Sequence, residues 1–347
     1  MNPTHTRLLT AESVRRGHPD KLCDQIADAI LDEHLRQDPA ARVAIEVFAA
    51  TGKILIAGEV TSQAKVEYKQ IALHLLKEVR YQPADVCSAT EQHLEIEVRV
   101  HAQSPDIARA VGSGEKMGAG DQGIMVGFAC NETEEMLPLP VVLAHKLCRE
   151  MDRMQRDCTW LRPDGKVQVT VVYADDCPLY VKTIVLSAQY TKKACPVCMK
   201  KALLKMVHKV IPPKLLSGKT KILINPSGRF VLGGLAADTG LTGRKLAVDQ
   251  YGPAARIGGG ALSGEDPTKV DRSGAYMARY VAKNLVAAGL ARRCEVQLAY
   301  AIGRARPVSV SVNSFGTGCL SDQRLAAVVR VLFDLRPSAI IGTLSLR

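Results

Sequence analysis

Two spacings of hydrophobic residues run along the chain. At Leu22, Ile26 and Ile30 an apolar side chain recurs every four residues, which places these side chains on one helix face, and Asp38 followed by proline ends the run. Other segments alternate apolar and polar residues, which is typical of half-buried strands. The hydrophobic pattern therefore predicts a chain that mixes amphipathic helices with strands.

One order of elements is predicted three times, namely strand, helix, two strands, helix and strand. Turn residues such as Thr51-Gly52 and a helix stop at Gly289 separate the elements. The predicted helices cover 20–37, 62–79, a segment that begins at 140, 197–210, 272–288 and 321–333. The predicted strands cover 42–48, 53–60, 93–101, 124–129, 167–173, 181–188, 220–225, 245–250, 295–302, 308–313 and 338–346.

These elements predict an α/β (α+β) fold of three pseudo-repeated β-α-β-β-α-β units, each a sheet with helices on one face. The units are expected at residues 1–102, 118–228 and 236–347. The helices cover only one face of each sheet, so another unit or another chain must cover the opposite face. The pattern therefore also predicts a self-associating protein.

The composition is that of a globular protein, with 47% hydrophobic and 23% charged residues. No apolar run reaches the roughly 20 residues that span a bilayer, and residues 1–10 lack the apolar segment of a secretory signal. We therefore expect a cytoplasmic protein without a membrane partner. The ten cysteines are expected to be reduced thiols, and Cys195 and Cys198 lack the second pair that a zinc site needs.

The net charge of +11 leaves nucleic acid, polyphosphate and a solvated basic surface open. Only 4% of the residues are aromatic, so there are few platforms on which single-stranded bases could stack. Carboxylates stand among the lysines of the glycine-rich loops, and carboxylates repel a phosphate backbone unless a metal intervenes. We therefore expect no nucleic-acid partner.

Polar loops lie between the predicted elements, where functional residues are often found. Asp121 and Asp238 occupy equivalent loops, 118–123 and 236–245, before the second and third units. They are either residues with a chemical role or parts of tight turns that need aspartate and glycine.

A third loop, 258–264, is rich in glycine, which lets backbone amides approach phosphate, and Lys269 and Asp271 follow it at a predicted helix start. This spacing suits a phosphate with its magnesium ion, or a flexible loop followed by an aspartate N-cap. Residues 217–220 resemble the end of a phosphate-binding P-loop. They are not one, because Pro213 stands where that motif needs glycine and the order of helix and strand is reversed.

Seven motifs follow one another in a specific order along the chain. They are Gly17-His18-Pro19-Asp20-Lys21, 118–123, Leu161-Arg162-Pro163-Asp164, 225–230, 240–245, 258–264 and Lys269-Val270-Asp271-Arg272-Ser273. In order and spacing the chain resembles the S-adenosylmethionine synthetase family, also called methionine adenosyltransferase, over about residues 8–337. The three β-α-β-β-α-β units of that family agree with the predicted repeat.

The resemblance implies that S-adenosylmethionine is made from ATP and L-methionine. The methionine sulfur would attack C5′ of ATP and expel the triphosphate, which the family then hydrolyses to pyrophosphate and phosphate. The sulfur carries no proton, so alignment and electrostatic stabilisation matter more than a general base. Mg²⁺ and K⁺ are the implied cofactors. A homodimer or a dimer of dimers is implied, because residues from two subunits complete each site.

The motifs also imply roles for individual residues. The implied catalytic residues are His18, Lys166, Asp121, Arg244, Lys245 and Lys269. Nucleotide binding is implied for Asp164, Lys166, Ser227, Gly228, Arg229, Phe230, Asp238, Arg244, Lys245, Ala261, Lys269 and Asp271. Methionine binding is implied for Glu59, Gln103, Asp121, Asp238 and Lys269. The implied metal ligands are Glu12 and Asp20 for magnesium and Glu46 for potassium.

Four features depart from the family pattern. Glu265 stands where a phosphate-binding lysine is usual, Arg15 and Arg16 replace a small and an acidic residue, the gating segment 104–117 is short, and the family's C-terminal tail is absent. They predict reduced activity. They also leave an alternative open, a catalytically impaired paralogue that keeps the fold and modulates an active subunit in a hetero-oligomer.

Overall fold

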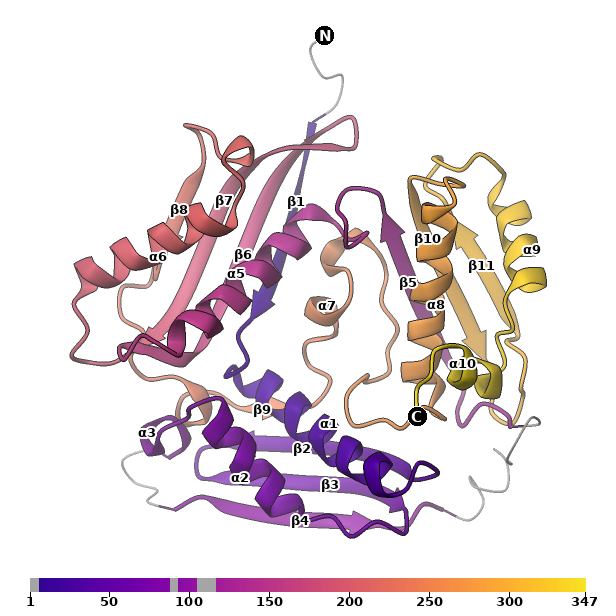
Figure 1. Cartoon of the computed structure of the whole chain (residues 1–347), viewed down its shortest axis with the longest axis horizontal. Helices are drawn as coiled ribbons and strands as arrows, with labels where there is room; N and C mark the ends of the chain where they lie inside the picture. Colours follow the sequence, from indigo (N-terminus) through magenta and orange to yellow (C-terminus); the bar gives the residue numbers. More distant parts are fainter. Residues whose placement is uncertain (1–5, 88–92, 105–116) are drawn as a thin grey trace.

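The computed structural model describes residues 6–87, 93–104 and 117–347, and it confirms the α/β fold class. Figure 1 shows three sheets with helices packed on them. Two of the sheets stand side by side, and the third lies below them. The expected gating segment falls almost entirely outside the described residues.

The lower sheet has the order β4 (Glu95–His101), β3 (Lys53–Thr61), β2 (Arg42–Ala50) and β9 (Gly240–Leu241). Strands β2 and β3 form the predicted antiparallel hairpin, whereas β4 runs parallel to β3. Helices α1 (Pro19–Gln37) and α2 (Tyr68–Glu78) cover one face of this sheet. Their apolar side chains pack on inward-facing strand residues such as Ile45 and Ile54, which are fully buried.

The second sheet has the order β1 (Thr6–Val14), β6 (Leu161–Ala174), β7 (Cys177–Tyr190) and β8 (Lys221–Ile224), covered by α5 (Leu139–Gln155) and α6 (Pro196–Val210). The third has the order β11 (Ser309–Asn313), β10 (Arg293–Tyr300) and β5 (Gly123–Cys130). Helices α8 (Val270–Ala287), α9 (Asp322–Leu332) and α10 (Pro337–Thr343) pack on this third sheet. Short helices α3 (Pro83–Val86) and α7 (Leu246–Asp249) lie in the connections.

The first strand of each expected unit pairs with a sheet made mainly by another unit. Strand β1 pairs with β6, β5 pairs with β10, and β9 pairs with β2. Each sheet therefore contains a strand from elsewhere in the chain, so the three units are interlocked and not independent bodies. This exchange brings the loops that precede β5 and follow β9 next to helices of other units.

Two predicted strands of the third unit are wrong. Residues 245–250 contain α7, a single helical turn in which Val248 is the buried residue. Residues 338–346 form α10 and the turn after it, because Pro337 occupies the first helical position and Ile340 packs into the core of the third sheet. Over so few residues, alternation does not distinguish a strand from a short helix.

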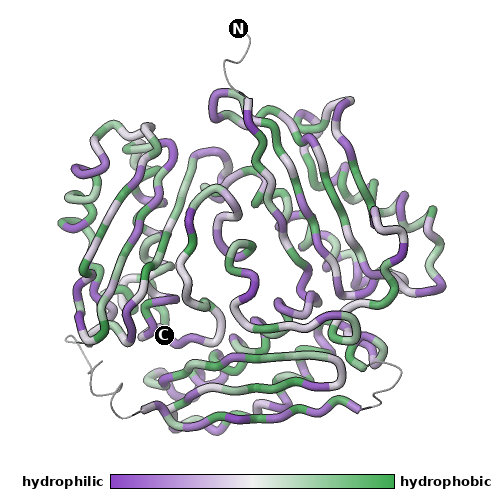
Figure 2. The backbone as a smooth tube through the Cα atoms, turned by 180° about the vertical axis from the view of Figure 1, so that it is seen from behind, coloured by the Kyte–Doolittle hydropathy of each residue, from purple (hydrophilic) through white to green (hydrophobic). Residues whose placement is uncertain are grey.

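Each sheet keeps one face free of helices. Along β2, buried residues alternate with Glu46 and Phe48, which point to the open face and are exposed. Leu8 on β1, Ile124 on β5 and Leu223 on β8 are also exposed, and hydrophobic and hydrophilic positions alternate along the strands in Figure 2. Among the described residues, no helix combines the length and apolar character needed to cross a membrane.

Candidate functional site

His18 lies at the N-terminus of α1, where it caps the helix. Its Nδ1 accepts a hydrogen bond from the backbone N–H of Asp20 at 3.2 Å. Proline at the first helical position and a capping side chain before it are the local reasons that α1 begins here. Because Nδ1 is the acceptor, a neutral His18 carries its proton on Nε2. That nitrogen is the ring's hydrogen-bond donor, and no acceptor for it is recorded among the described residues.

His18 is neutral at physiological pH. Burial lowers the pKa of its imidazole to about 4, and the ammonium groups of Lys245 and Lys166 act in the same direction. The structure thus places two sequence-predicted cations close to His18. Such a group donates a hydrogen bond without competing for a proton near pH 7.

Asp20 joins the same group of residues. Its buried carboxylate is ion-paired with Lys245 Nζ, lies 3.6 Å from Nε of Arg244, and accepts a hydrogen bond of 3.0 Å from the N–H of Leu241. Burial opposes ionisation, but the contacts with Lys245 and Leu241 outweigh it and lower the pKa of the Asp20 carboxyl. We call His18, Asp20, Arg244 and Lys245 the His18 cluster.

Lys269, Asp271 and Asp121 form a second group, at the start of α8. Lys269 is ion-paired with Asp266, a fully buried carboxylate that also accepts a 2.8 Å hydrogen bond from the N–H of Val43. Burial raises the pKa of the Asp271 carboxyl, and the negative charge of Asp121 raises it further, so these two carboxyls lie near each other.

The glycine-rich loop 258–264 runs between the two groups. A Cβ atom added to Gly260 would lie 2.1 Å from Cγ of Asp271, and one added to Gly243 would lie 3.2 Å from Cβ of Ala261. The loop therefore touches Asp271 at one point and, through Ala261, the segment that carries Arg244. A larger residue at position 260 would clash, which is the physical reason for glycine there.

Glu265 follows this loop and is largely enclosed. It forms an isolated bridge with Ala44 of β2, and its Oε2 is buried without a hydrogen-bond partner among the described residues. Burial raises the pKa of this carboxyl to about 8. The nearby charges of Asp266, Asp271 and Glu46 also raise it, whereas Lys269 lowers it. At neutral pH the side chain is therefore mostly uncharged, so it adds little negative charge beside Lys269.

Other predicted nucleotide-binding residues lie near β6. Asp164 is buried and accepts a 2.9 Å hydrogen bond from the N–H of Gly234, and burial raises the pKa of its carboxyl. Phe230 packs against the core of the second sheet, whereas Ser227, Gly228 and Arg229 are exposed. Asp238 is also exposed and accepts a 2.8 Å hydrogen bond from the N–H of Thr239.

The two predicted methionine-binding residues that lie outside the loops contact each other. Gln103 Nε2 donates to Oε1 of Glu59 at 3.4 Å, which joins the end of β4 to β3. The structure records no hydrogen bond or ion pair from this pair to the His18 cluster within the described residues.

The predicted metal ligands are apart from one another. Glu12 lies on β1 opposite Gln168, Glu46 lies on the open face of β2, and the carboxylate of Asp20 is engaged by Lys245 and Arg244. Across the three described ranges, no group of three or more His, Cys, Asp or Glu side chains is arranged to hold a metal ion. A protein-only metal cage is therefore absent from the described residues of a single chain.

Two residues that anchor the predicted glycine loops were missed by the sequence reasoning. Asp24 Oδ1 accepts a 3.0 Å hydrogen bond from the N–H of Gly243, and Asp28 Oδ1 accepts one of 2.9 Å from the N–H of Gly264. With Asp20, they form a row of carboxylates on α1 that holds the two glycine loops of the third unit. The signal was available, because aspartates at 20, 24 and 28 recur every four residues on one helix face.

Arg15 and Arg16, the departures before Gly17, have different surroundings. Arg15 is fully buried, and its Nε lies 2.8 Å from Oδ1 of Asp152. Its Nη2 also donates to Gln155 at 2.8 Å, which ties the segment before α1 to the end of α5. Arg16 is exposed and pairs with Glu78 at 2.8 Å.

The fold and the His18 cluster define an α/β protein of three interlocked sheets that gathers cations beside a neutral histidine. Three family models match it, the N-terminal, central and C-terminal domains of S-adenosylmethionine synthetase, over residues 6–105, 116–230 and 232–347. The chain belongs to the S-adenosylmethionine synthetase family.

Curated relatives support this assignment. The chain is 50% identical to the S-adenosylmethionine synthase of Thermosynechococcus vestitus, over 98% of this chain and 88% of the relative. It is 49% identical to the S-adenosylmethionine synthase of Thermus thermophilus, over 98% of this chain and 90% of the relative. The similarity thus extends through all three sheets.

Proposed function

We propose that the chain synthesises S-adenosylmethionine from ATP and L-methionine. The carrying observation is the His18 cluster, in which a neutral histidine at a helix N-terminus lies among lysine and arginine side chains. The C5′–O bond of ATP breaks as the new S–C5′ bond forms, so negative charge gathers on the departing triphosphate. Donors and cations that are already in place stabilise that charge without reorganising.

Each residue of the cluster has a defined part in this proposal. His18 donates from Nε2 to the oxygen that leaves C5′, and Lys245, Arg244 and Lys166 attract the phosphates. Lys269 adds a cation at the start of α8. No residue needs to act as a base in the first step, because the methionine sulfur has no proton to lose.

The remaining predicted residues would hold the two substrates. Asp164, the segment 227–230, Ala261 and Asp271 are assigned to the nucleotide. Glu59, Gln103, Asp121 and Asp238 are assigned to methionine, whose ammonium group and nascent sulfonium favour carboxylates. The contact between Gln103 and Glu59 supports a shared role for that pair.

The ions fit this arrangement only together with substrate. Mg²⁺ is usually bound by one or two carboxylates together with several waters and phosphate oxygens. Asp20 and Glu12 would supply the carboxylates and the substrate would supply the phosphate oxygens, so a closed protein cage is not needed. When bound, it would neutralise phosphate charge. K⁺ is assigned to Glu46, whose carboxylate is exposed on the open face of β2.

The proposal includes a homodimer or a dimer of dimers formed through the open sheet faces. Exposed apolar side chains on β1, β2, β5 and β8 support it, because they lie on the faces that the helices leave uncovered. A partner chain would cover them, and it would bring its own loops to each site.

The deciding experiment incubates the purified protein with ATP, methionine, Mg²⁺ and K⁺ and measures S-adenosylmethionine, pyrophosphate and phosphate. Omitting methionine separates triphosphate release from simple ATP hydrolysis. Formation of S-adenosylmethionine supports the proposal. Its absence, in protein that still binds ATP, would favour the alternative of an impaired paralogue, which is then tested by mixing the chain with an active family member.

A further inference from the structure

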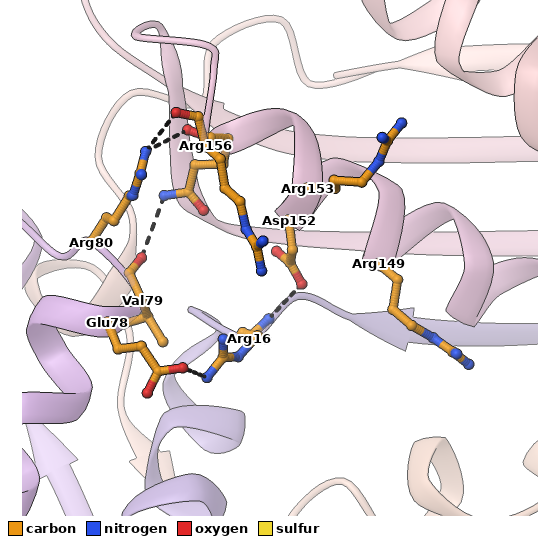
Figure 3. A pocket seen from close by; sticks show the side chains of 9 residues that line it. Arg16, Glu78, Val79, Arg80, Arg149, Asp152, Arg153 and Arg156 are labelled. Atoms are coloured by element: carbon orange, nitrogen blue, oxygen red, sulfur yellow. Dashed lines mark hydrogen bonds and ion pairs between the residues drawn. The ribbon is translucent and has the colours of Figure 1, made fainter.

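A cavity of about 550 Å³ lies between the end of α2 and the last turns of α5, and no residue of the His18 cluster lines it. Its volume falls within the range of about 300–1,000 Å³ typical of small-molecule sites. We call it the basic pocket, and Figure 3 shows it from close by. The arginines that line it are Arg16, Arg80, Arg149, Arg153 and Arg156.

The charges of the basic pocket do not balance. Five arginines and two carboxylates, those of Glu78 and Asp152, line the pocket, which leaves a surplus of three positive charges. Figure 3 shows the side chains of Arg149 and Arg153 extending outward from the others. Both carboxylates are already engaged, since Glu78 pairs with Arg16 at 2.8 Å and Asp152 pairs at 2.8 Å with the buried Arg15. Neither is therefore free to neutralise the other arginines.

The remaining arginines have few acidic partners. Arg153 pairs with Glu150, but Lys209 shares that carboxylate at 3.0 Å. Arg80 donates to the carbonyl oxygens of Gln155 and Arg156, each at 3.0 Å. Arg149 and Arg156 are exposed, and their guanidinium groups form no recorded hydrogen bond or ion pair with the described residues.

The spacing of two of the arginines shows that the cluster has a cost. Arg149 and Arg153 are four residues apart on one face of α5, a spacing at which like charges destabilise a helix. The φ of 65° at Arg80 belongs to the end of α2, where the N–H groups of Arg80 and Tyr81 donate to the carbonyl oxygens of Lys77 and Leu76. The dipole of α5 favours cations at its C-terminus, but Arg16 and Arg80 reach the same pocket from other elements.

We infer that the basic pocket binds a compact anion that carries two or more phosphate groups. Arginine is suited to this ligand, because its planar guanidinium donates two parallel hydrogen bonds to phosphate oxygens. Arginines from three separate segments would contact one ligand. A single monovalent anion could not pair with all of these guanidinium groups. The ligand is either a free oligophosphate or the phosphate chain of a nucleotide, and both present the same chemistry.

The test counts binding sites by isothermal titration of the full-length protein with tripolyphosphate and, separately, with ATP, both at low ionic strength. The variant Arg149→Glu/Arg156→Glu reverses two charges of the basic pocket and touches no residue of the His18 cluster. The matched control is Lys200→Glu/Lys205→Glu, which makes the same change in net charge on the exposed side of α6.

We expect wild type and the control to bind one more tripolyphosphate per chain than the arginine variant. The affinity of that extra site should fall as salt is added. If the arginine variant loses a site in the tripolyphosphate titration but not in the ATP titration, the ligand is a free oligophosphate. If it loses a site in both titrations, the ligand is the phosphate chain of a nucleotide. If all three proteins bind the same number of ligands, the inference is overturned. Should the double glutamate variant fail to fold, Arg149→Gln/Arg156→Gln provides the same comparison.

This result is independent of the proposed synthesis. Catalytic failure would leave the extra site measurable, and loss of the extra site would leave S-adenosylmethionine formation unchanged in the arginine variant.

Discussion

Replacing Glu265 by glutamine should stabilise the fold at alkaline pH and leave its stability nearly unchanged at pH 4.5. The carboxyl is enclosed near Asp266 and Asp271, and its Oε2 has no partner among the described residues. Its pKa is about 8 in the fold against an ordinary 4.5, chiefly because burial disfavours the charged form. Glutamine has nearly the same shape and never ionises.

The sign follows from the raised pKa. The stabilisation that Glu265 contributes as a protonated group is fully present below pH 4.5, and it is lost as the pH rises through about 8. Each pH unit between these values corresponds to about 1.4 kcal/mol, which sets an upper limit of about 5 kcal/mol. Because the side chain is partly accessible to water, we expect a gain of about 1–3 kcal/mol for Glu265→Gln at pH 8.5.

The assay is urea unfolding of both proteins at pH 4.5, 7 and 8.5, at one fixed protein concentration so that self-association does not change the comparison. Glu134→Gln, at an exposed glutamate, is the matched control and should show no pH-dependent difference. A difference between Glu265→Gln and wild type that stays constant across the pH range would refute the reasoning. It would mean that the carboxyl ionises normally in the fold.

Glu265→Lys carries the same reasoning into catalysis. An ammonium group at this position would lie among Asp266, Asp271 and Glu46, three carboxylates that favour a cation. At neutral pH the change adds about one positive charge beside the proposed phosphate site, because Glu265 itself is mostly uncharged. We expect kcat/KM for ATP to rise about tenfold, equivalent to ~1.4 kcal/mol. Unchanged kcat/KM and triphosphate hydrolysis would show that residue 265 does not act on the phosphates.

Three further predictions follow from the described contacts. His18→Asn should lower kcat by at least about 100-fold and leave the stability to unfolding nearly unchanged. The control His208→Asn should change neither kcat nor stability. If His18→Asn unfolds early, the role of His18 is structural. Asp24→Ala removes the acceptor for the N–H of Gly243, so it should cost about 1–3 kcal/mol of stability and raise KM for ATP. Urea unfolding and initial-rate kinetics check both effects, and wild-type values for both would exclude the anchoring role. Phe48→Asp should shift the protein toward monomer in sedimentation, and a wild type that is already monomeric at micromolar concentration would contradict association through the open sheet faces.

The sequence by itself determined most of the local structure. The four-residue spacing of Leu22, Ile26 and Ile30 predicted α1, and Thr51-Gly52 predicted the turn between β2 and β3. These features depend on neighbours in the chain, so a linear pattern contains them. The order of the motifs likewise indicated the family, because tight loops require particular residues, such as glycine, that can be recognised in the sequence.

The tertiary structure alone decided which strands pair. Strands β1, β5 and β9 leave the unit in which they begin, and alternation with a period of two fits one sheet as well as another. It also decided the charge of buried groups. The neutral state of His18 and the raised pKa of Glu265 depend on burial and on charges far away in the sequence, such as that of Lys245 beside His18. A linear pattern records which groups can ionise, but only the fold sets the water and the charges around each one.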